Sequence, residues 1–87
     1  MSNKIVAKKS LRAVVTGASS GIGLEFCRRL AEMGHNLVMV SNQESELIRY
    51  GAEISQKHGV EVSTYALDLT EENAASKLLY FLSSHNL

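Results

Sequence analysis

The sequence has 87 residues, of which 45% are hydrophobic, and its nine basic and nine acidic side chains give a formal net charge of zero. This length allows one small domain, which buries only roughly 60–65% of the surface that its unfolded chain exposes. The hydrophobic content argues against disorder. The balanced charge gives no support to nucleic-acid binding, which usually shows as a basic patch or stripe.

Residues 1–10 contain three lysines and no apolar core ahead of the first expected strand. They are therefore predicted to be a flexible lead-in and not a signal peptide, followed by one domain over residues 11–87. No apolar run approaches the roughly 18 residues that span a bilayer, so we expect no membrane partner. Cys27 is the single cysteine, which excludes an internal disulfide and is consistent with a cytoplasmic location.

The first predicted strand, Leu-Arg-Ala-Val-Val over residues 11–15, leads into a glycine-rich segment, Thr-Gly-Ala-Ser-Ser-Gly-Ile-Gly over residues 16–23. Glycine permits positive φ and leaves no Cβ in the path of a ligand. A helix is expected to follow, and the free N–H groups at its start attract an anion such as a pyrophosphate. The order of strand, glycine turn and helix therefore predicts a phosphate-binding loop. The alternative is a turn that only joins two elements.

The first helix is predicted from about Ser20 to Met33, and Gly34 is placed to end it in a left-handed conformation. Apolar residues recur along it at helical spacing, which predicts one packed stripe. This stripe consists of Ile22, Phe26, Leu30 and Met33, widened by Cys27 and Ala31.

The second strand is predicted over residues 36–40, and its four consecutive apolar residues favour burial on both faces. Ser41 and Glu44 have the spacing of a capping box at the start of a second helix, which Gly59 ends. Gly51 within it costs roughly 1 kcal/mol against alanine unless a close contact needs the gap. The predicted packed side of this helix consists of Leu47, Ile48, Gly51, Ala52, Ile54 and Ser55.

The third strand is predicted over residues 60–67, where alternation with charge on one side indicates an edge strand. Thr70 is a candidate N-cap for a third helix. The apolar face of that helix is predicted to contain Ala74, Ala75, Leu78, Leu79 and Leu82, with Phe81 at its margin. The three histidines lie near the ends of helices, which favours surface positions over a metal site.

The element order β-α-β-α-β-α predicts an α/β fold. Right-handed crossovers place the first two helices on one face of a parallel sheet. We therefore expect a partial Rossmann-type, three-layer arrangement with three parallel strands in the order 3-2-1 and helices on both faces. The ligand site should then open beside the end of the first strand.

The segment from Thr16 to Gly23 matches every fixed position of the pattern T-G-x-x-x-G-x-G. On these residues, the chain from about residue 11 to 87 resembles the N-terminal, cofactor-binding half of the short-chain dehydrogenase/reductase family. The resemblance implies an NAD(P)-dependent oxidoreductase that interconverts alcohols and carbonyl compounds. It also implies that the adenosine-pyrophosphate half of the cofactor contacts Gly17, Ser19, Ser20, Gly21, Ile22, Gly23, Ser41, Asn42, Asp68 and Leu69.

The resemblance leaves the choice between NAD and NADP open. Ser41 and Asn42 stand where the family often places an acidic residue for the adenosine ribose or a basic residue for the extra phosphate. Ser20 stands where many NADP-preferring relatives have an arginine. Asp68 and Leu69 resemble the family's Asp-hydrophobic pair, whose aspartate contacts the adenine. The alternative for Asp68 is that it only organises the start of the next helix.

The family's catalytic pattern is missing from these 87 residues. The three tyrosines, Tyr50, Tyr65 and Tyr80, are each followed four residues later by a residue other than lysine, so no Tyr-x-x-x-Lys pair exists. We therefore expect a truncated fragment that is inactive alone. The alternatives are a non-catalytic nucleotide-binding module and a structural unit that self-associates. Because a fourth strand would pair with the first in the full fold, we also expect a homo-oligomer formed through the unpaired edge of the first strand.

Overall fold

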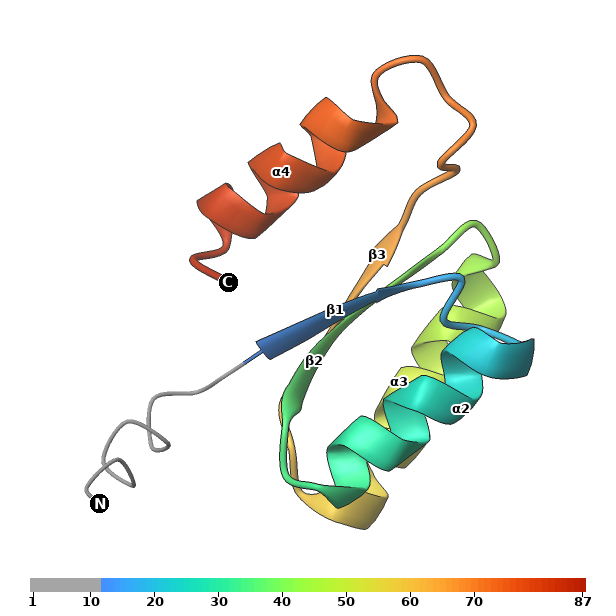
Figure 1. The fold of residues 1–87 in the computed structure, drawn as a ribbon, viewed down its shortest axis with the longest axis vertical. Helices are drawn as coiled ribbons and strands as arrows, with labels where there is room; N and C mark the ends of the chain where they lie inside the picture. Colours follow the sequence, from blue (N-terminus) through green and yellow to red (C-terminus); the bar gives the residue numbers. More distant parts are fainter. Residues whose placement is uncertain (1–11) are drawn as a thin grey trace.

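The computed structural model describes residues 12–87, so the lead-in predicted over residues 1–10 lies outside the described residues. Strands and helices alternate in the predicted order (Figure 1). The elements are β1 (Arg12–Thr16), α2 (Gly21–Glu32), β2 (Asn36–Ser41), α3 (Glu44–His58), β3 (Val62–Ala66) and α4 (Ala74–Ser84).

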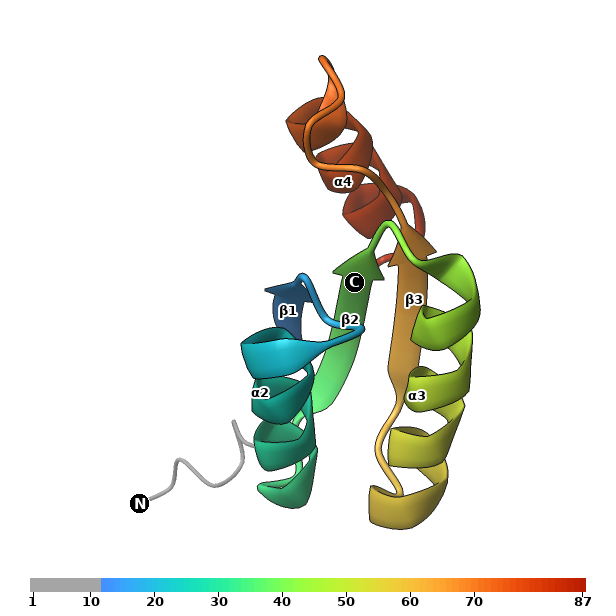
Figure 2. The same cartoon turned by 90° about the vertical axis from the view of Figure 1, so that its right-hand side faces the viewer.

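The three strands form one parallel sheet with β2 in the centre. In the register, Val14 of β1 lies beside Val38 of β2, which lies beside Ser63 of β3. The helices α2 and α3 cover one face of the sheet and α4 lies on the other (Figure 2). The strand order 3-2-1, the edge position of β3 and the three layers are therefore confirmed.

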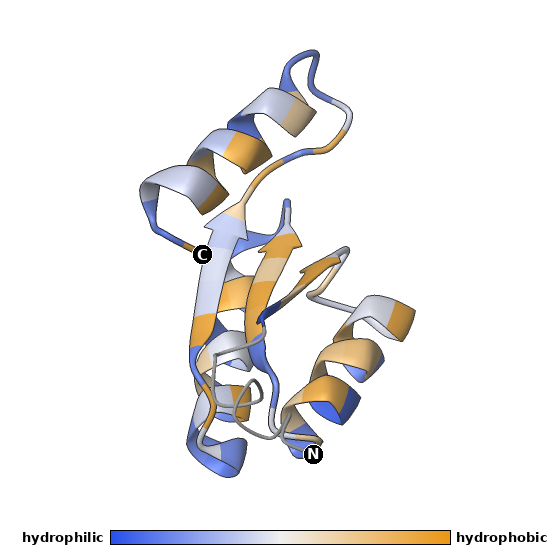
Figure 3. Ribbon diagram, turned by 60° about the vertical axis from the view of Figure 1, so that its left-hand side comes forward, coloured by the Kyte–Doolittle hydropathy of each residue, from blue (hydrophilic) through white to orange (hydrophobic). Residues whose placement is uncertain are grey.

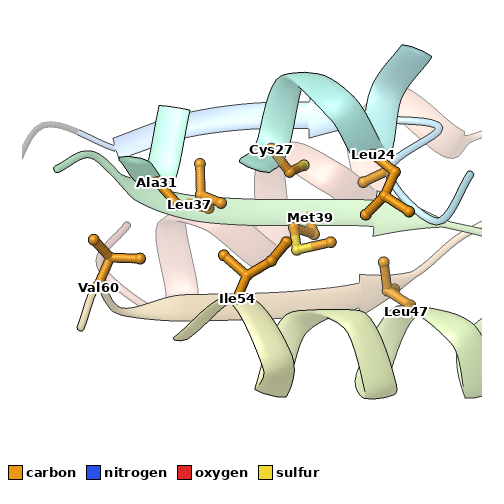
Figure 4. Packing of buried hydrophobic residues seen from close by; sticks show 9 residues of the cluster. Leu24, Cys27, Ala31, Leu37, Met39, Leu47, Ile54 and Val60 are labelled. Atoms are coloured by element: carbon orange, nitrogen blue, oxygen red, sulfur yellow. The ribbon is translucent and has the colours of Figure 1, made fainter. Parts of the chain in front are cut away.

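The main core lies between the sheet and the pair α2 and α3 (Figure 4). Leu37 and Met39 of β2 point into it, while Val38 and Val40 point to the opposite face, and all four are fully buried. Each such side chain contributes about 1.5–3 kcal/mol of transfer free energy relative to an exposed one. The burial of β2 on both faces agrees with its predicted central position.

The predicted packed stripe of α2 is only partly right: Cys27 and Ala31 are buried and Leu30 packs against the core, but the other members of the stripe are exposed. Ile22, Phe26 and Met33 are 76%, 58% and 70% exposed. The residues that α2 buries are Leu24, Cys27 and Ala31. The rotation of the helix follows from its first turn, because Gly23 lies directly against the backbone of Gly17 and thereby fixes which side of α2 faces the sheet.

The second helix, α3, begins at Glu44 with Gln43 at its N-cap position. The predicted capping box is therefore wrong, because Ser41 is the last residue of β2. The predicted packed side was also too broad, since Leu47, Gly51 and Ile54 are buried whereas Ile48 and Ala52 are exposed. A Cβ on Gly51 would lie 2.9 Å from Cγ2 of Thr64, so this glycine lets the helix approach the sheet closely. Gly59 ends α3 with a φ of 69°, as predicted.

The third predicted helix, α4, begins at Ala74 with Asn73 at its N-cap position, so Thr70 is not the cap. Leu79 is 67% exposed, contrary to its predicted place on the packed face. Phe81 packs against the sheet instead, where its ring stacks on that of Tyr65 with the centroids 4.3 Å apart. The Tyr65 side chain lies on the face of the sheet that α4 covers. Stacking on its ring places Phe81 within the packed face of α4 and not at the margin of that face, where it was predicted.

Candidate functional site

The carboxyl ends of the three strands bring three loops together at one edge of the sheet. A cavity of about 230 Å³ opens there, and five of the residues predicted to bind a cofactor line it, namely Gly17, Ser41, Asn42, Asp68 and Leu69. Two backbone hydrogen bonds hold the loops in place: the N–H of Ala18 donates to the carbonyl of Val40 (3.0 Å), and the N–H of Leu67 donates to that of Ser41 (2.9 Å).

The three glycines of the loop have different geometries. Gly17 and Gly21 have φ values of 63° and 60°, in the left-handed region that side chains other than hydrogen disfavour. A Cβ on either would meet no atom within 4 Å, so the space beside their backbone is open. A Cβ on Gly23 would instead overlap the carbonyl oxygen of Gly17. Two glycines therefore leave room at the surface, and the third brings α2 against the loop.

The start of α2 adjoins this open space. Its N-cap residue Ser20 is extended, and within the described part of the chain no side chain caps this helix and its first turn holds no acidic residue. The first turn of α3, by contrast, contains Glu44 and Glu46. The first N–H groups of a helix lack intrahelical acceptors and carry roughly half a positive charge. The positive end of the α2 dipole therefore lies near the edge of the cavity, and no acidic side chain in the first turn of α2 neutralises it.

A closed set of hydrogen bonds lies at the end of β2. The Ser19 hydroxyl donates to Oε1 of Gln43 (2.7 Å), and the backbone N–H of Gln43 donates to Oγ of Ser41 (3.0 Å). The two serine oxygens are 2.7 Å apart. Because Ser19 has already used its proton, the hydroxyl of Ser41 donates to Ser19. Both buried serines are thus satisfied inside the protein, which leaves the side-chain amides of Asn42 and Gln43 as the donors at the surface.

Asp68 holds a tight turn after β3. Its Oδ1 accepts hydrogen bonds from the Thr70 hydroxyl (2.7 Å) and from the Thr70 backbone N–H (2.9 Å). These two donors, the hydroxyl first, lower the pKa of Asp68 below its ordinary value and keep the carboxylate ionised. Asp68 therefore organises the turn after β3, whereas α4 begins only at Ala74 with Asn73 at its N-cap position. Contact of Asp68 with an adenine stays a prediction.

The remaining predicted residues lie around the cavity and do not line it. Ser20 and Ile22 are exposed at the start of α2, and Ser19 is buried beneath the loop. Sequence reasoning missed Leu67 and Thr70, which line the cavity, and Gln43, which holds the two serines. The spacing of Thr70 two residues after Asp68 signals an Asx-type turn. Gln43 has no comparable local signal.

Two other hollows have a different character. One of about 500 Å³ adjoins the site, shares Asn42 and Asp68 with it, and extends to the ion pair of Lys77 and Glu71 (2.8 Å). The other, about 510 Å³, is a groove of charged side chains between α2 and α3.

Within residues 12–87 there is no cluster of three potential metal-ligating side chains. None of the helices α2, α3 and α4 is long and apolar enough to cross a membrane.

The glycine loop, the open start of α2 and the parallel sheet agree with a comparison of the whole sequence, which matches the short chain dehydrogenase family over residues 11–85. The chain belongs to this family. The resemblance inferred from the residues 16–23 is thereby confirmed over almost the whole chain.

Curated relatives and solved structures agree with this assignment. The very-long-chain 3-oxoacyl-CoA reductase of Laccaria bicolor is 41% identical over 73 residues, which are 84% of this chain and 22% of the relative. The short-chain dehydrogenase of Sphingobium yanoikuyae, solved in complex with NADPH, is 33% identical with a TM-score of 0.78. The L-sorbose reductase of Gluconobacter frateurii, solved with NADPH and L-sorbose, is 31% identical with a TM-score of 0.81.

The match to the Sphingobium yanoikuyae structure covers 83% of this chain and 28% of that protein. The match to the Gluconobacter frateurii structure covers 86% of this chain and 28% of that protein. The chain thus spans less than a third of the length of each of these three proteins. The shared part is the one that contains the glycine loop.

Proposed function

We propose that this chain is the cofactor-binding part of an NAD(P)-dependent short-chain oxidoreductase that interconverts alcohols and carbonyl groups. Its role is to hold the adenosine-pyrophosphate half of the dinucleotide. The observation that supports this role is the juxtaposition of the uncapped start of α2 with the open backbone of Gly17 and Gly21, beside a cavity that also contains Asp68.

The pyrophosphate fits the glycine loop on physical grounds. An anion approaching Gly17 and Gly21 meets main chain and no Cβ, and it reaches N–H groups at the positive end of α2. Attraction of this kind contributes typically 0.3–1 kcal/mol per charge at an exposed helix end. Gly21, Ile22 and Gly23 supply the backbone donors, while Ser20 lies at the N-cap position.

The adenosine fits the cavity beyond the loop. Leu69 is half exposed and Leu67 lines the same wall, which gives an apolar surface for a purine ring. The ionised carboxylate of Asp68 accepts hydrogen bonds, so it is suited to an exocyclic amino group. Asn42 and the amide of Gln43 are neutral donors for the ribose. Because these groups can bind either a ribose hydroxyl or a phosphate, we expect both NAD and NADP to bind.

The bound cofactor would supply or accept the hydride, and the residues of this chain only hold its adenosine end. Proton transfer in the family relies on the tyrosine of a Tyr-x-x-x-Lys pair, which these 87 residues lack. Two of the similar proteins are reductases by name, of a 3-oxoacyl-CoA and of L-sorbose. A carbonyl compound is therefore the substrate class that we propose for a complete enzyme of this kind.

Calorimetric titration of the 87-residue chain with NADP and with NAD tests the proposal. We expect saturable binding of both, with dissociation constants in the micromolar to millimolar range and within about tenfold of each other, which corresponds to 1.4 kcal/mol. Absence of saturable binding for both cofactors at millimolar concentration would contradict it.

A further inference from the structure

The glycine loop after β1 has little intrinsic preference for the conformation that it adopts. Gly17 and Gly21 both have positive φ, and a Cβ on either would meet no atom within 4 Å. Glycine adopts positive and negative φ about equally readily and loses more backbone freedom on folding than any other residue. The open form of the loop, in which an anion can reach the start of α2, therefore depends on contacts with neighbouring segments.

Ser19 makes such a contact from within the loop. Its hydroxyl donates to Oε1 of Gln43 (2.7 Å) and accepts from the hydroxyl of Ser41 (2.7 Å). Both serines are buried, at the point where the hydrophobic strand β2 passes into the hydrophilic segment before α3 (Figure 3). A buried hydroxyl that loses its partner costs more free energy than the hydrogen bond itself contributes. This contact therefore opposes rearrangement of the loop.

Gln43 is itself held at three points. Its backbone N–H donates to Oγ of Ser41 (3.0 Å), which forms a turn of the ST type. Its carbonyl accepts from the N–H of Leu47 (2.9 Å), which is in the first turns of α3. Its side chain reaches Ser19, 24 residues earlier in the sequence. The Gln43 side chain thus extends from a fixed base at the start of α3 to the glycine loop.

We propose, in a step that rests on the proposed function, that Gln43 is a positioning residue for the cofactor. Through Ser19 it keeps the glycine loop in the form that receives the pyrophosphate. Ser19 then has an indirect role in place of the direct cofactor contact that the family resemblance implies, because its proton is already donated inside the protein. The loop that carries Asn42 for the ribose is thereby joined to the loop that holds the pyrophosphate.

Calorimetric titration with NAD tests whether residue 43 controls the affinity. Gln43→Met keeps the length of the side chain and removes the oxygen that accepts from Ser19. If the binding-competent form of the loop falls to about a tenth of the population, the apparent dissociation constant rises about tenfold. We therefore expect Gln43→Met to weaken the binding of NAD by about tenfold or more. Gln56→Met is the matched control: it makes the same change at an exposed position near the other end of α3, and it should alter the affinity less than about twofold.

Two further variants distinguish positioning from a direct contact between the Gln43 amide and the ribose. Gln43→Glu keeps an oxygen that accepts from Ser19 but has no amide N–H groups, so it should bind NAD within about threefold of the native chain. Ser19→Ala removes the donor. In that background Gln43→Met should weaken binding by less than about twofold more, because the two residues act through one hydrogen bond. NAD is used because it lacks the 2′-phosphate, which the carboxylate in Gln43→Glu would repel.

Amide hydrogen exchange of the chain without cofactor gives a readout that does not depend on binding. The N–H of Ala18 donates to the carbonyl of Val40 (3.0 Å), and it exchanges when the loop separates from the end of β2. We expect Gln43→Met to accelerate this exchange by about tenfold or more, and Gln43→Glu and Gln56→Met to leave it within about twofold. The other amides of β2 should exchange at nearly unchanged rates, which shows that the variants are folded.

The outcomes separate this proposal from the proposed function. If the native chain binds NAD and Gln43→Met binds it as tightly as Gln56→Met does, the positioning role is wrong and the cofactor site stands. Equal losses in Gln43→Met and Gln43→Glu would also contradict positioning, because the amide would then contact the ribose directly. If the native chain binds neither cofactor, the proposed function fails. The exchange of Ala18 then decides alone, and an unchanged rate in Gln43→Met would show that Gln43 does not hold the loop.

Discussion

At the scale of the residue, the loop after β1 uses glycine in two distinct ways. Gly17 and Gly21 hold left-handed backbone with open space beside them. Gly23 has an ordinary φ, but a side chain there would overlap the carbonyl oxygen of Gly17. Even alanine at Gly23 should therefore push α2 away from the sheet and cost about 1–3 kcal/mol, as overpacking does. The loop conformation and the packing of the helix depend on different glycines.

Gly21 and Gly34 offer a matched pair of substitutions. Both have positive φ, and a Cβ on either meets no atom within 4 Å, but Gly34 lies after the far end of α2. Each change to valine should destabilise the chain by about 1–3 kcal/mol through backbone strain. We expect only Gly21→Val to weaken the binding of NADP, by at least tenfold in calorimetric titration, because its side chain occupies the approach of the phosphates. Equal affinities of the two variants would show that the loop is not the site.

Cys27 provides a prediction about pH. Burial in the core raises the pKa of its thiol to about 11, compared with about 8.5 in an unfolded chain. Folding therefore favours the protonated thiol, and the stability from this group is complete below about pH 8.5 and is lost as the pH rises toward 11. At pH 8 we expect a thiol reagent to label the native chain at least 100-fold more slowly than the chain in denaturant. Rapid labelling of native protein would mean that Cys27 is accessible.

At the scale of the element, the strands could be predicted better than the faces of the helices. The run from Leu37 to Val40 is apolar at every position, which indicates a central strand whichever way it is turned. The face that α2 buries, by contrast, depends on the contact between Gly23 and Gly17, and this contact is not visible in the periodicity. Ile22, Phe26 and Met33 have perfect helical spacing for a packed stripe and remain exposed.

Phe81 and Leu79 on α4 test the corrected packing of that helix. Phe81 stacks on Tyr65, while Leu79 is exposed. Phe81→Ala should lower the free energy of unfolding by about 2 kcal/mol, less than for a fully buried phenylalanine because Phe81 is half-buried. Leu79→Ala should change it by less than about 0.5 kcal/mol. Urea denaturation of the two variants decides this, and a larger effect at Leu79 would restore the originally predicted face.

At the scale of the whole molecule, the location of the site follows from topology. Parallel strands end at the same edge, and the family resemblance named Gly17, Ser41 and Asp68 as site residues, so the two together predicted that they would meet. They did not predict that Ser19 would be buried against Ser41 and Gln43, 22 and 24 residues away. Such contacts depend on the exact approach of two loops, which short-range patterns do not contain.

The last prediction separates binding from catalysis. Every group that we assign to the cofactor lies toward its adenosine-pyrophosphate half, and the sequence holds no Tyr-x-x-x-Lys pair. The 87-residue chain should therefore bind NADP and 2′-phospho-ADP-ribose, which lacks the nicotinamide, with affinities within about threefold, a difference of less than 1 kcal/mol. It should not oxidise NADPH in the presence of 3-oxoacyl-CoA or ketone substrates, because these 87 residues lack the Tyr-x-x-x-Lys pair whose tyrosine donates the proton in the family. Calorimetry measures the binding affinities, and the absorbance of the reduced nicotinamide of NADPH measures turnover on the same sample. Turnover above a matched blank, or a marked preference for the complete dinucleotide, would mean that residues of this chain reach the reacting end of the cofactor.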